Sequence, residues 1–269
     1  MSNSYLVFFG LQKEPFPVEV EIKDIYHTPN VAGVVERFEY AVRLGAMALV
    51  TGEIGSGKTT ALRYAASTLH PSEYLVVNLI GSSGSLLELH RQLLNALGID
   101  FSSNSKAVMV RLIKREIADL VLGRKIKPVL IVDEASLIRM EVFAEIHTIT
   151  QFERESRAYL PVILAGQNSL VDRLMYRTSL PLASRIVARS HLEGVDRQQM
   201  EDYLKHQLAI AGLKHNCFDE QAITAIHQGS GGIFRKANHL ARGAMIAAVG
   251  QKQHIVTAEH VRIAASEIF

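Results

Sequence analysis

The sequence predicts an α/β fold in which helices cover both faces of a parallel sheet, followed by a small all-helical domain. Short apolar runs alternate with amphipathic helical stretches through residues 1–194, the pattern of a buried parallel sheet. After residue 194 the apolar runs stop, and only stretches with helical spacing follow. We therefore predict a core over residues 1–194, which includes an N-terminal extension, and a helical domain over residues 195–269.

The core is expected to begin with an irregular segment over residues 1–30 that contains several prolines, and to continue with a helix at 30–45. Short apolar runs predict the strands, at 46–50, 73–81, 127–134, 160–166 and 185–193. Apolar residues at helical spacing predict the intervening helices, at 59–69, 85–98, 107–123, 141–154 and 168–176. The same criterion predicts four helices after the core, at 197–212, 219–228, 234–249 and 257–268.

The stretch LVTGEIGSGKTTAL (49–62) places several glycines between an apolar run and a helix former. Glycine loses the most backbone freedom on ordering, so such a loop needs a compensating role. The spacing Gly-x-x-x-x-Gly-Lys-Thr is that of a P-loop, whose backbone N–H groups surround phosphates at a helix N-terminus. We therefore predict a nucleotide-binding loop made of Gly52, Glu53, Ile54, Gly55, Ser56, Gly57, Lys58, Thr59 and Thr60.

The stretch PVLIVDEAS (128–136) ends an apolar strand with Asp133 and Glu134. A carboxylate at the end of a buried strand is costly unless it meets a cation or donors, although an aspartate there can also cap a helix. Next to a P-loop the expected cation is Mg²⁺, with Asp133 holding it through water and Thr59 supplying a hydroxyl ligand. Lys58 is expected to pair with the β- and γ-phosphates of ATP. Glu134 is expected to orient and deprotonate the attacking water. This additional carboxylate separates hydrolysing ATPases from nucleotide kinases of the same fold.

Three further polar residues are candidates for contacts with the γ-phosphate. Gln167 follows the strand 160–166, where it either reaches the phosphate or serves as a turn residue. Arg235 begins a helix of the helical domain and is expected to fold back onto the phosphate. Arg185 opens the last strand of the core, beside the nucleotide of a neighbouring subunit. For both arginines the alternative is a solvated or ion-paired surface position.

The composition and the N-terminal sequence bear on where the protein acts, but they do not identify a partner. The chain has 269 residues, a net charge of +2 and an isoelectric point near 8.6, which neither demands nor excludes nucleic acid. The single cysteine, Cys217, excludes an internal disulfide. The N-terminus lacks the pattern of a signal peptide, and no apolar run approaches the roughly 20 residues of a membrane span. We therefore expect a cytoplasmic protein.

With these motifs the chain resembles an AAA+ ATPase, and more narrowly the general-secretion-pathway A-type ATPases and the related transposition-helper ATPases. The stretches that carry the resemblance are YLVFFGLQKEPF, GEIGSGKTT, LIVDEAS, ILAGQNSL, ASRI and GGIFRKANHLA. The resemblance implies that Gln167 is sensor 1, that Arg235 is sensor 2 and that the helical domain is a lid. It makes Arg185 the candidate arginine finger, although other arginines are available, namely Arg154, Arg157, Arg173, Arg177 and Arg189.

The resemblance also implies an ATP-dependent homo-oligomer, a ring or a helical filament, and leaves two functions open. The first is binding of double-stranded DNA to assist transposition, by target selection or by activation of a partner transposase. The second is a secretion or assembly ATPase that acts in a protein complex without DNA. Secretion members continue into a membrane segment and a cell-wall-binding domain, whereas this sequence ends at Phe269. We therefore favour the DNA function.

The segment NSKAVMVRLIKREI (104–117) bears on this choice because it is rich in basic residues. Lys106, Arg111 and Lys114 are expected to line the pore of a ring or helix and to contact DNA phosphates. The alternative is a solvated helix face whose charge is balanced by Glu116 and Asp119.

Overall fold

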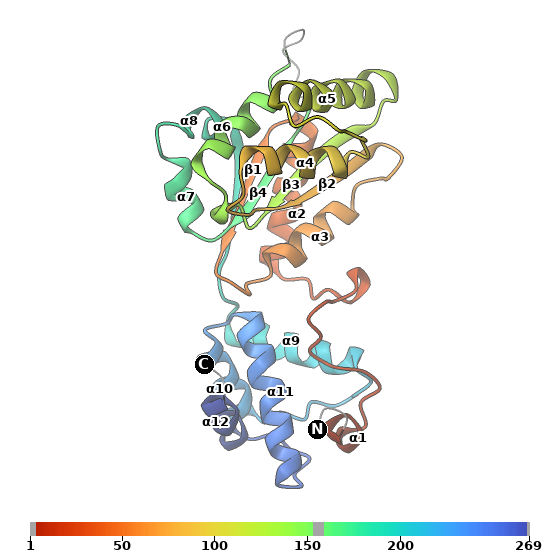
Figure 1. Ribbon diagram of the computed structural model, residues 1–269. Helices are drawn as coiled ribbons and strands as arrows, with labels where there is room; N and C mark the ends of the chain where they lie inside the picture. The colour runs from red at the N-terminus through yellow and green to blue at the C-terminus, as the bar shows by residue number, and fades with distance from the viewer. Residues whose placement is uncertain (1–3, 153–158, 268–269) are drawn as a thin grey trace. The chain divides into compact units, whose positions relative to one another are not determined.

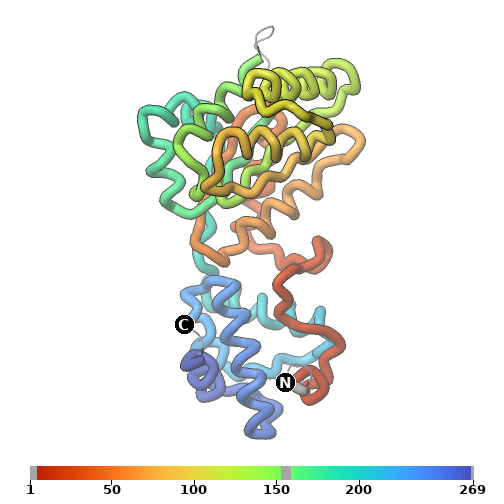
Figure 2. The backbone as a smooth tube through the Cα atoms, in the orientation of Figure 1, coloured from red at the N-terminus to blue at the C-terminus, as the bar shows by residue number. Residues whose placement is uncertain are grey.

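The computed structural model describes residues 4–152 and 159–267, which form two compact units (Figures 1 and 2). The α/β unit comprises Pro29–Gly52 and the described part of Lys58–Leu192. The helical unit comprises the described residues up to Thr28, the loop Glu53–Gly57, and the described residues from Glu193 onward.

The α/β unit is built on a five-stranded sheet in which all paired strands are parallel. The strands stand in the order β2-β3-β4-β1-β5, so β4 lies between β3 and β1. Their bounds are β1 Met47–Gly52, β2 Tyr74–Ile80, β3 Lys127–Asp133, β4 Val162–Gly166 and β5 Ile186–Leu192. This arrangement confirms the predicted fold class and brings the carboxyl ends of β1, β3 and β4 side by side.

Helices cover both faces of this sheet (Figure 1). The helices α2 (Pro29–Leu44) and α3 (Lys58–Ser67) pack on one face, against strand residues such as Ala48 and Val50. On the other face, alternate strand residues such as Met47 and Leu49 pack with α4 (Leu86–Ala96), α5 (Lys106–Ala118) and α6 (Met140–Ile149). Because both faces are covered, β1 is buried throughout, which explains its continuous apolar run.

Several elements differ from the sequence-based expectations in extent. The α5 helix ends at Ala118 and continues as a π-helical turn, Asp119–Gly123. The α6 helix ends at Ile149, short of the predicted residue 154, which lies outside the described residues. After α7 (Ser169–Leu174) the chain forms a further short helix, α8 (Leu180–Ala183), that the sequence pattern did not predict. Helices of one turn carry too few apolar positions to show a period.

The helical unit contains α9 (Arg197–Ile210), α10 (Glu220–Ser230), α11 (Phe234–Gly250) and α12 (Ala258–Glu267). Asp196 caps α9 through a capping box with Gln199. Two glycines, Gly231 and Gly232, adopt positive φ between α10 and α11 and allow the tight reversal there. Among the described helices, none is long and apolar enough to cross a bilayer.

The N-terminal segment packs into the core of this helical unit, although it is distant in sequence. It forms the short helix α1 (Ser4–Phe9) and a 3₁₀ turn, Ile22–Asp24, where an irregular segment was expected. Its aromatic residues Phe9 and Phe16 are buried among residues of α9 to α12. The N–H of Gln12 donates to the carbonyl of Ala211, 2.8 Å away. The sequence-based division instead counted this segment with the core, as an N-terminal extension.

Candidate active site

The P-loop lysine lies at the start of α3. Lys58 is the first residue of that helix, its side chain is 6% exposed, and its Nζ donates to the carbonyl of Gly52, 3.0 Å away. A buried ammonium is costly unless it meets anions or acceptors. Here the partial positive charge of the helix N-terminus adds to that of Lys58, so this position favours an anion.

The loop Glu53–Gly57 has the backbone that its glycines permit. Gly55 and Gly57 have φ values of 85° and 98°, in the left-handed region that favours glycine. The N–H of Ser56 donates to the carbonyl of Glu53, 3.2 Å away, and closes a turn. The Ser56 hydroxyl is buried and has no hydrogen-bond partner among the described residues. Buried polar groups are usually paired, so this orphaned hydroxyl fits a loop that receives a polar ligand.

Within the helical unit the same loop contacts the beginning of α11. The N–H of Arg235 donates to the carbonyl of Gly55 at 3.2 Å. A Cβ at Gly55 would lie 2.5 Å from the Cβ of Arg235, so the close approach requires glycine. Arg235 thus lies in the first turn of the helix that contacts the loop, and its assignment as sensor 2 stays a prediction.

The two motifs that were predicted to hold Mg²⁺ meet in the α/β unit. Thr59 Oγ1 donates to Asp133 Oδ2 at 2.5 Å, although the residues are 74 positions apart. The other carboxylate oxygen, Oδ1, accepts from the N–H of Glu134 at 2.8 Å. A hydroxyl and a carboxylate are the hard oxygen donors that Mg²⁺ prefers when substrate phosphates complete its shell. The residues therefore fit the predicted cation.

Glu134 has a backbone conformation that is unusual for a residue with a side chain. Its φ of 52° and ψ of 32° are left-handed, which costs about 1–3 kcal/mol. Its carbonyl accepts from the N–H of Leu137, 2.9 Å away, and closes the 3₁₀ turn η3 (Ala135–Leu137). Such strain concentrates at functional sites, where the surrounding structure maintains it. The glutamate is half-buried at the carboxyl end of β3.

Gln167 follows β4, the strand between the P-loop strand β1 and the acidic strand β3. The register pairs Thr51 with Gly166 and Val132 with Leu164, so Gln167 leaves the sheet between the two motifs. Its backbone N–H donates to Ser136 Oγ at 3.3 Å. Gln167 thus lies between the P-loop strand and the acidic strand, and its contact with the γ-phosphate stays a prediction.

The candidate arginine finger, Arg185, lies one residue before β5 and is half-buried. Its Nη1 donates to Thr150 Oγ1, 3.1 Å away, at the end of α6. Burial lowers the pKa of the neighbouring His147, and the charge of Arg185 acts in the same direction.

The other arginines considered as fingers from the sequence differ in their surroundings. Arg173 donates to carbonyl groups of its own chain and Arg177 and Arg189 are exposed, whereas Arg154 and Arg157 lie outside the described residues.

Two of the three predicted DNA contacts are held within the α/β unit. Lys106 Nζ pairs with Glu145 Oε2 at 2.7 Å, and Glu145 also meets the fully buried His90 at 2.9 Å. Burial acts to raise the pKa of Glu145, but the hydrogen bonds and charges of Lys106 and His90 outweigh it, and the pKa is lowered. Lys114 Nζ donates to the carbonyl of Gln151 at 2.8 Å.

The rest of the basic helix also differs from expectation. Glu116 and Asp119, which balance its charge in the alternative interpretation, instead pair with Arg124, each at 2.8 Å. Arg111 and Arg115 are exposed, and neither forms an ion pair with any described residue. Arg111 and Arg115 are therefore the exposed basic residues of α5 that form no ion pair with a described residue.

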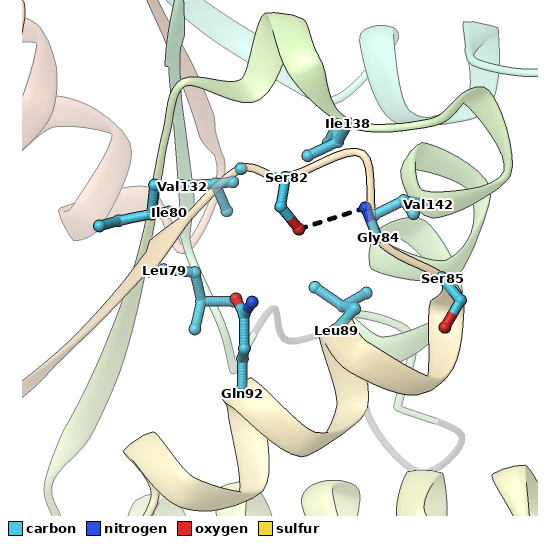
Figure 3. Close-up of a pocket in the computed structure, with 11 residues that line it drawn as sticks. Leu79, Ile80, Ser82, Gly84, Ser85, Leu89, Gln92, Val132, Ile138 and Val142 are labelled. Atoms are coloured by element: carbon cyan, nitrogen blue, oxygen red, sulfur yellow. Dashed lines mark hydrogen bonds between the residues drawn. The ribbon is translucent and has the colours of Figure 1, made fainter.

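Sequence reasoning did not single out two residues that contact the Asp133–Glu134 turn. Ser136 links the turn to Gln167, and Gly81 follows β2 and lies against the carbonyl of Glu134. The only sequence signals are a glycine directly after the predicted strand for Gly81 and a small polar residue shortly after the acidic pair for Ser136. Gly81 also lines a small pocket between the end of β2, the start of α4 and α6 (Figure 3). Its volume of about 20 Å³ has room for little more than one water, so it does not hold the nucleotide.

Comparison with known proteins agrees with this geometry. Residues 42–174, which include the P-loop, the acidic motif and Gln167, match the family model described as an AAA domain. Residues 42–174 are thus an AAA domain, and the chain is a P-loop ATPase. This finding confirms the resemblance that the sequence motifs indicated.

The chain is also similar to one curated protein in sequence and to several solved proteins in structure. It is 28% identical over 98% of its length to general secretion pathway protein A of Aeromonas hydrophila, of which it spans 48%. The chain thus spans about half the length of that relative. Its structure is similar to Cdc6p of Pyrobaculum aerophilum, with a TM-score of 0.74 and 15% identity over 95% of this chain and 70% of that one. It is also similar to ORC1 of Aeropyrum pernix in complex with DNA, with a TM-score of 0.70 and 18% identity over 96% and 70% of the chains.

Proposed function

We propose that this AAA+ ATPase assembles with ATP into a homo-oligomer on double-stranded DNA and assists transposition, with a transposase as its partner. The contact between Thr59 and Asp133 carries the nucleotide part of the proposal. It joins the P-loop to the acidic motif and leaves two hard oxygen ligands together beside the buried ammonium of Lys58.

The residues of the site have separate tasks in this proposal. Lys58 binds the β- and γ-phosphates, while Thr59 and Asp133 hold the cation. Mg²⁺, when bound, neutralises charge on the phosphate oxygens. Glu134 takes the proton of the attacking water, and Gln167 orients that water against the γ-phosphate. Arg235 and a neighbouring subunit's copy of Arg185 neutralise the charge that develops on the transferred phosphoryl group.

Two observations support a role on DNA. The similar ORC1 protein was solved in complex with DNA, which shows that this fold is compatible with a DNA-binding protein. On α5, Arg111 and Arg115 lie one helical turn apart, and both are exposed. Arginines spaced in this way are suited to successive phosphate contacts. We therefore assign the DNA contacts to Arg111 and Arg115 ahead of Lys106 and Lys114, whose ammonium groups have partners within the chain.

Replacement of Arg111 and Arg115 with alanine is expected to weaken ATP-dependent DNA binding by a similar factor for all sequences. Each neutralised phosphate releases counterions, so affinity falls steeply as salt rises. The double variant should flatten the slope of log affinity against log salt by roughly one unit per lost contact. Fluorescence anisotropy with labelled duplexes at several salt concentrations measures both effects.

The control for this experiment is Arg124→Ala, because the charge of Arg124 is already neutralised by Glu116 and Asp119. This control should keep the wild-type salt slope. A double variant that binds DNA as tightly as wild type would show that α5 presents only a solvated face. Absence of ATP-dependent DNA binding by the wild-type protein at low salt would contradict the DNA function itself.

The similarity to general secretion pathway protein A favours a second candidate, a secretion or assembly ATPase that acts in a protein complex without DNA. The two functions differ in what stimulates turnover. On the DNA hypothesis, double-stranded DNA raises the steady-state ATPase rate and changes particle shape in electron micrographs. On the second, neither quantity responds to DNA.

Arg185→Ala is expected to slow hydrolysis about 10³-fold or more, with a much smaller effect on nucleotide affinity, because a finger acts on transition-state charge. The decisive measurement is the activity of mixed oligomers. Arg185→Ala and Lys58→Ala subunits should together recover activity, since Lys58→Ala subunits supply the finger to intact sites of their neighbours. If oligomers form and no mixing ratio restores turnover, Arg185 does not act from the neighbouring subunit.

A further inference from the structure

We propose that Arg173 is a positioning residue for Glu134, holding the catalytic glutamate's turn in place and linking it to Gln167. The inference rests on the proposed role of Glu134 as the base. The sequence offered Arg173 as an alternative arginine finger for a neighbouring subunit. Here it acts within its own subunit instead.

The guanidinium of Arg173 spans the turn that follows Glu134. Arg173 lies on α7, and its Nη1 donates to the carbonyl of Ser136 at 3.0 Å. Its Nη2 donates to the carbonyl of Ile138, directly after η3. Two nitrogens of one planar group thus hold two carbonyls of a single turn. Both terminal nitrogens of the Arg173 guanidinium are therefore engaged within the chain.

A second contact joins the same turn to the end of β4. Ser136 Oγ accepts from the backbone N–H of Gln167, 3.3 Å away. A Cβ at Gly166 would lie 2.9 Å from the backbone nitrogen of Ser136, so the two backbones meet closely. Arg173 and Gln167 therefore hold the turn from one side, through α7 and the residues that precede it.

The opposite side of the turn is held by the end of β2. The N–H of Gly81 donates to the carbonyl of Asp133 at 2.6 Å. A Cβ at Gly81 would lie only 2.4 Å from the carbonyl oxygen of Glu134. The peptide groups around Glu134 are thus fixed between Gly81 on one side and Arg173 with Ser136 on the other.

This arrangement explains how Glu134 keeps its left-handed backbone. A strained residue persists only where its surroundings over-determine its conformation. Without Arg173, the Ser136 and Ile138 carbonyls lose their donors, and the backbone of Glu134 can relax toward a more common conformation. The carboxylate would then move away from the attacking water. Misplacement by about 1 Å costs on the order of 10²-fold in rate.

Arginine is the side chain that this position requires. Its planar fork presents two fixed donors, whereas lysine offers a single ammonium on a flexible stem. Arg173→Lys should therefore restore only part of the activity that Arg173→Ala loses. We call the contacts of Arg173 with the carbonyls of Ser136 and Ile138 the clamp. Gln167 also contacts Ser136, so a change at the γ-phosphate that moves Gln167 is transmitted to the turn of Glu134.

The test compares nucleotide affinity, turnover and trans-complementation. Arg173→Ala should lower the ATPase kcat by about 10²-fold and leave the ATP dissociation constant within a few-fold of wild type. Added guanidinium ion, at concentrations that leave the protein folded, should restore part of the activity to Arg173→Ala. The matched control is Arg43→Ala, which removes an exposed arginine from α2 and should change neither quantity.

Mixing separates a positioning residue from a finger. Arg173→Ala subunits mixed with Lys58→Ala subunits should recover no activity, because the defect lies in the subunit that binds ATP. Recovery of activity in this mixture would overturn the inference and make Arg173 a finger. Equal kcat for Arg173→Ala and wild type would also overturn it.

Gly81→Ala tests the opposite side of the turn and keeps the inference falsifiable if Arg173→Ala does not fold. It should lower kcat at unchanged ATP affinity, because the added methyl displaces the carbonyl of Glu134. Wild-type turnover by both Gly81→Ala and Arg173→Lys would refute the clamp.

The underlying function is tested separately by Glu134→Gln. If that variant loses turnover while Arg173→Ala keeps it, only the positioning role fails; if Glu134→Gln keeps turnover, the proposed role of the glutamate fails.

Discussion

Glu134→Gln is expected to bind ATP with Mg²⁺ as the wild type does and to hydrolyse it about 10²–10⁴-fold more slowly. The amide keeps the shape of the side chain but cannot accept the proton of the attacking water, and general bases contribute a factor of this size. Loss of kcat with unchanged affinity is the signature of an interaction that acts in the transition state. Any oligomer that requires ATP should therefore be long-lived in this variant.

Steady-state and single-turnover ATPase rates measure the effect, and nucleotide affinity is followed with a fluorescent ATP analogue. Glu141→Gln is the matched control, because Glu141 is an exposed residue at the start of α6. Turnover by Glu134→Gln within a few-fold of wild type would show that another group accepts the proton.

Lys58→Ala is expected to abolish measurable nucleotide binding. The side chain is buried, and its ammonium is the P-loop cation predicted to meet the β- and γ-phosphates. Removal of one member of a buried, hydrogen-bonded charge pair typically costs about 2–5 kcal/mol, which lowers affinity by about thirtyfold or more. Hydrolysis and ATP-dependent self-assembly of the variant alone should fail with it, whereas in mixtures its subunits can join ATP-bound neighbours.

Isothermal titration calorimetry with ATP and Mg²⁺ measures this loss directly. Lys127→Ala removes a lysine from the opposite end of the strand that carries Asp133, where Lys127 lies over the ring of Tyr74. This control should bind ATP normally. Wild-type affinity in Lys58→Ala would refute the assignment of the loop.

The sheet and most helices follow from local patterns that the sequence displays directly. The central strands β1, β3 and β4 are buried on both faces, so each appears as an apolar run, and the covering helices show apolar residues at helical spacing. The P-loop is equally local, because Gly55 and Gly57 supply the positive φ values that the loop geometry requires. Its partner Asp133 was identified from the cost of a carboxylate at a buried strand end.

Other properties depend on contacts between residues far apart in the chain. The sequence shows Lys106 as one of several basic residues on a helix, but only the packing of α5 against α6 reveals that the buried Glu145 neutralises it. Likewise Arg173 has the same local appearance as Arg177, yet α7 brings only Arg173 against the turn of Glu134. The N-terminal aromatic residues show no period, and their burial depends on the helices of a distant segment.

The sequence by itself thus determined the fold class, the phosphate loop and the acidic strand end, because each depends on residues that are neighbours in the chain. The tertiary structure decided which basic side chains have a partner within the chain. Lys106 pairs with Glu145 and Arg173 holds the turn of Glu134, whereas Arg111 and Arg115 form no ion pair with any described residue. The physical reason is that backbone conformation and periodic burial are encoded locally, whereas the partner of a long flexible cation is set by which elements pack beside it.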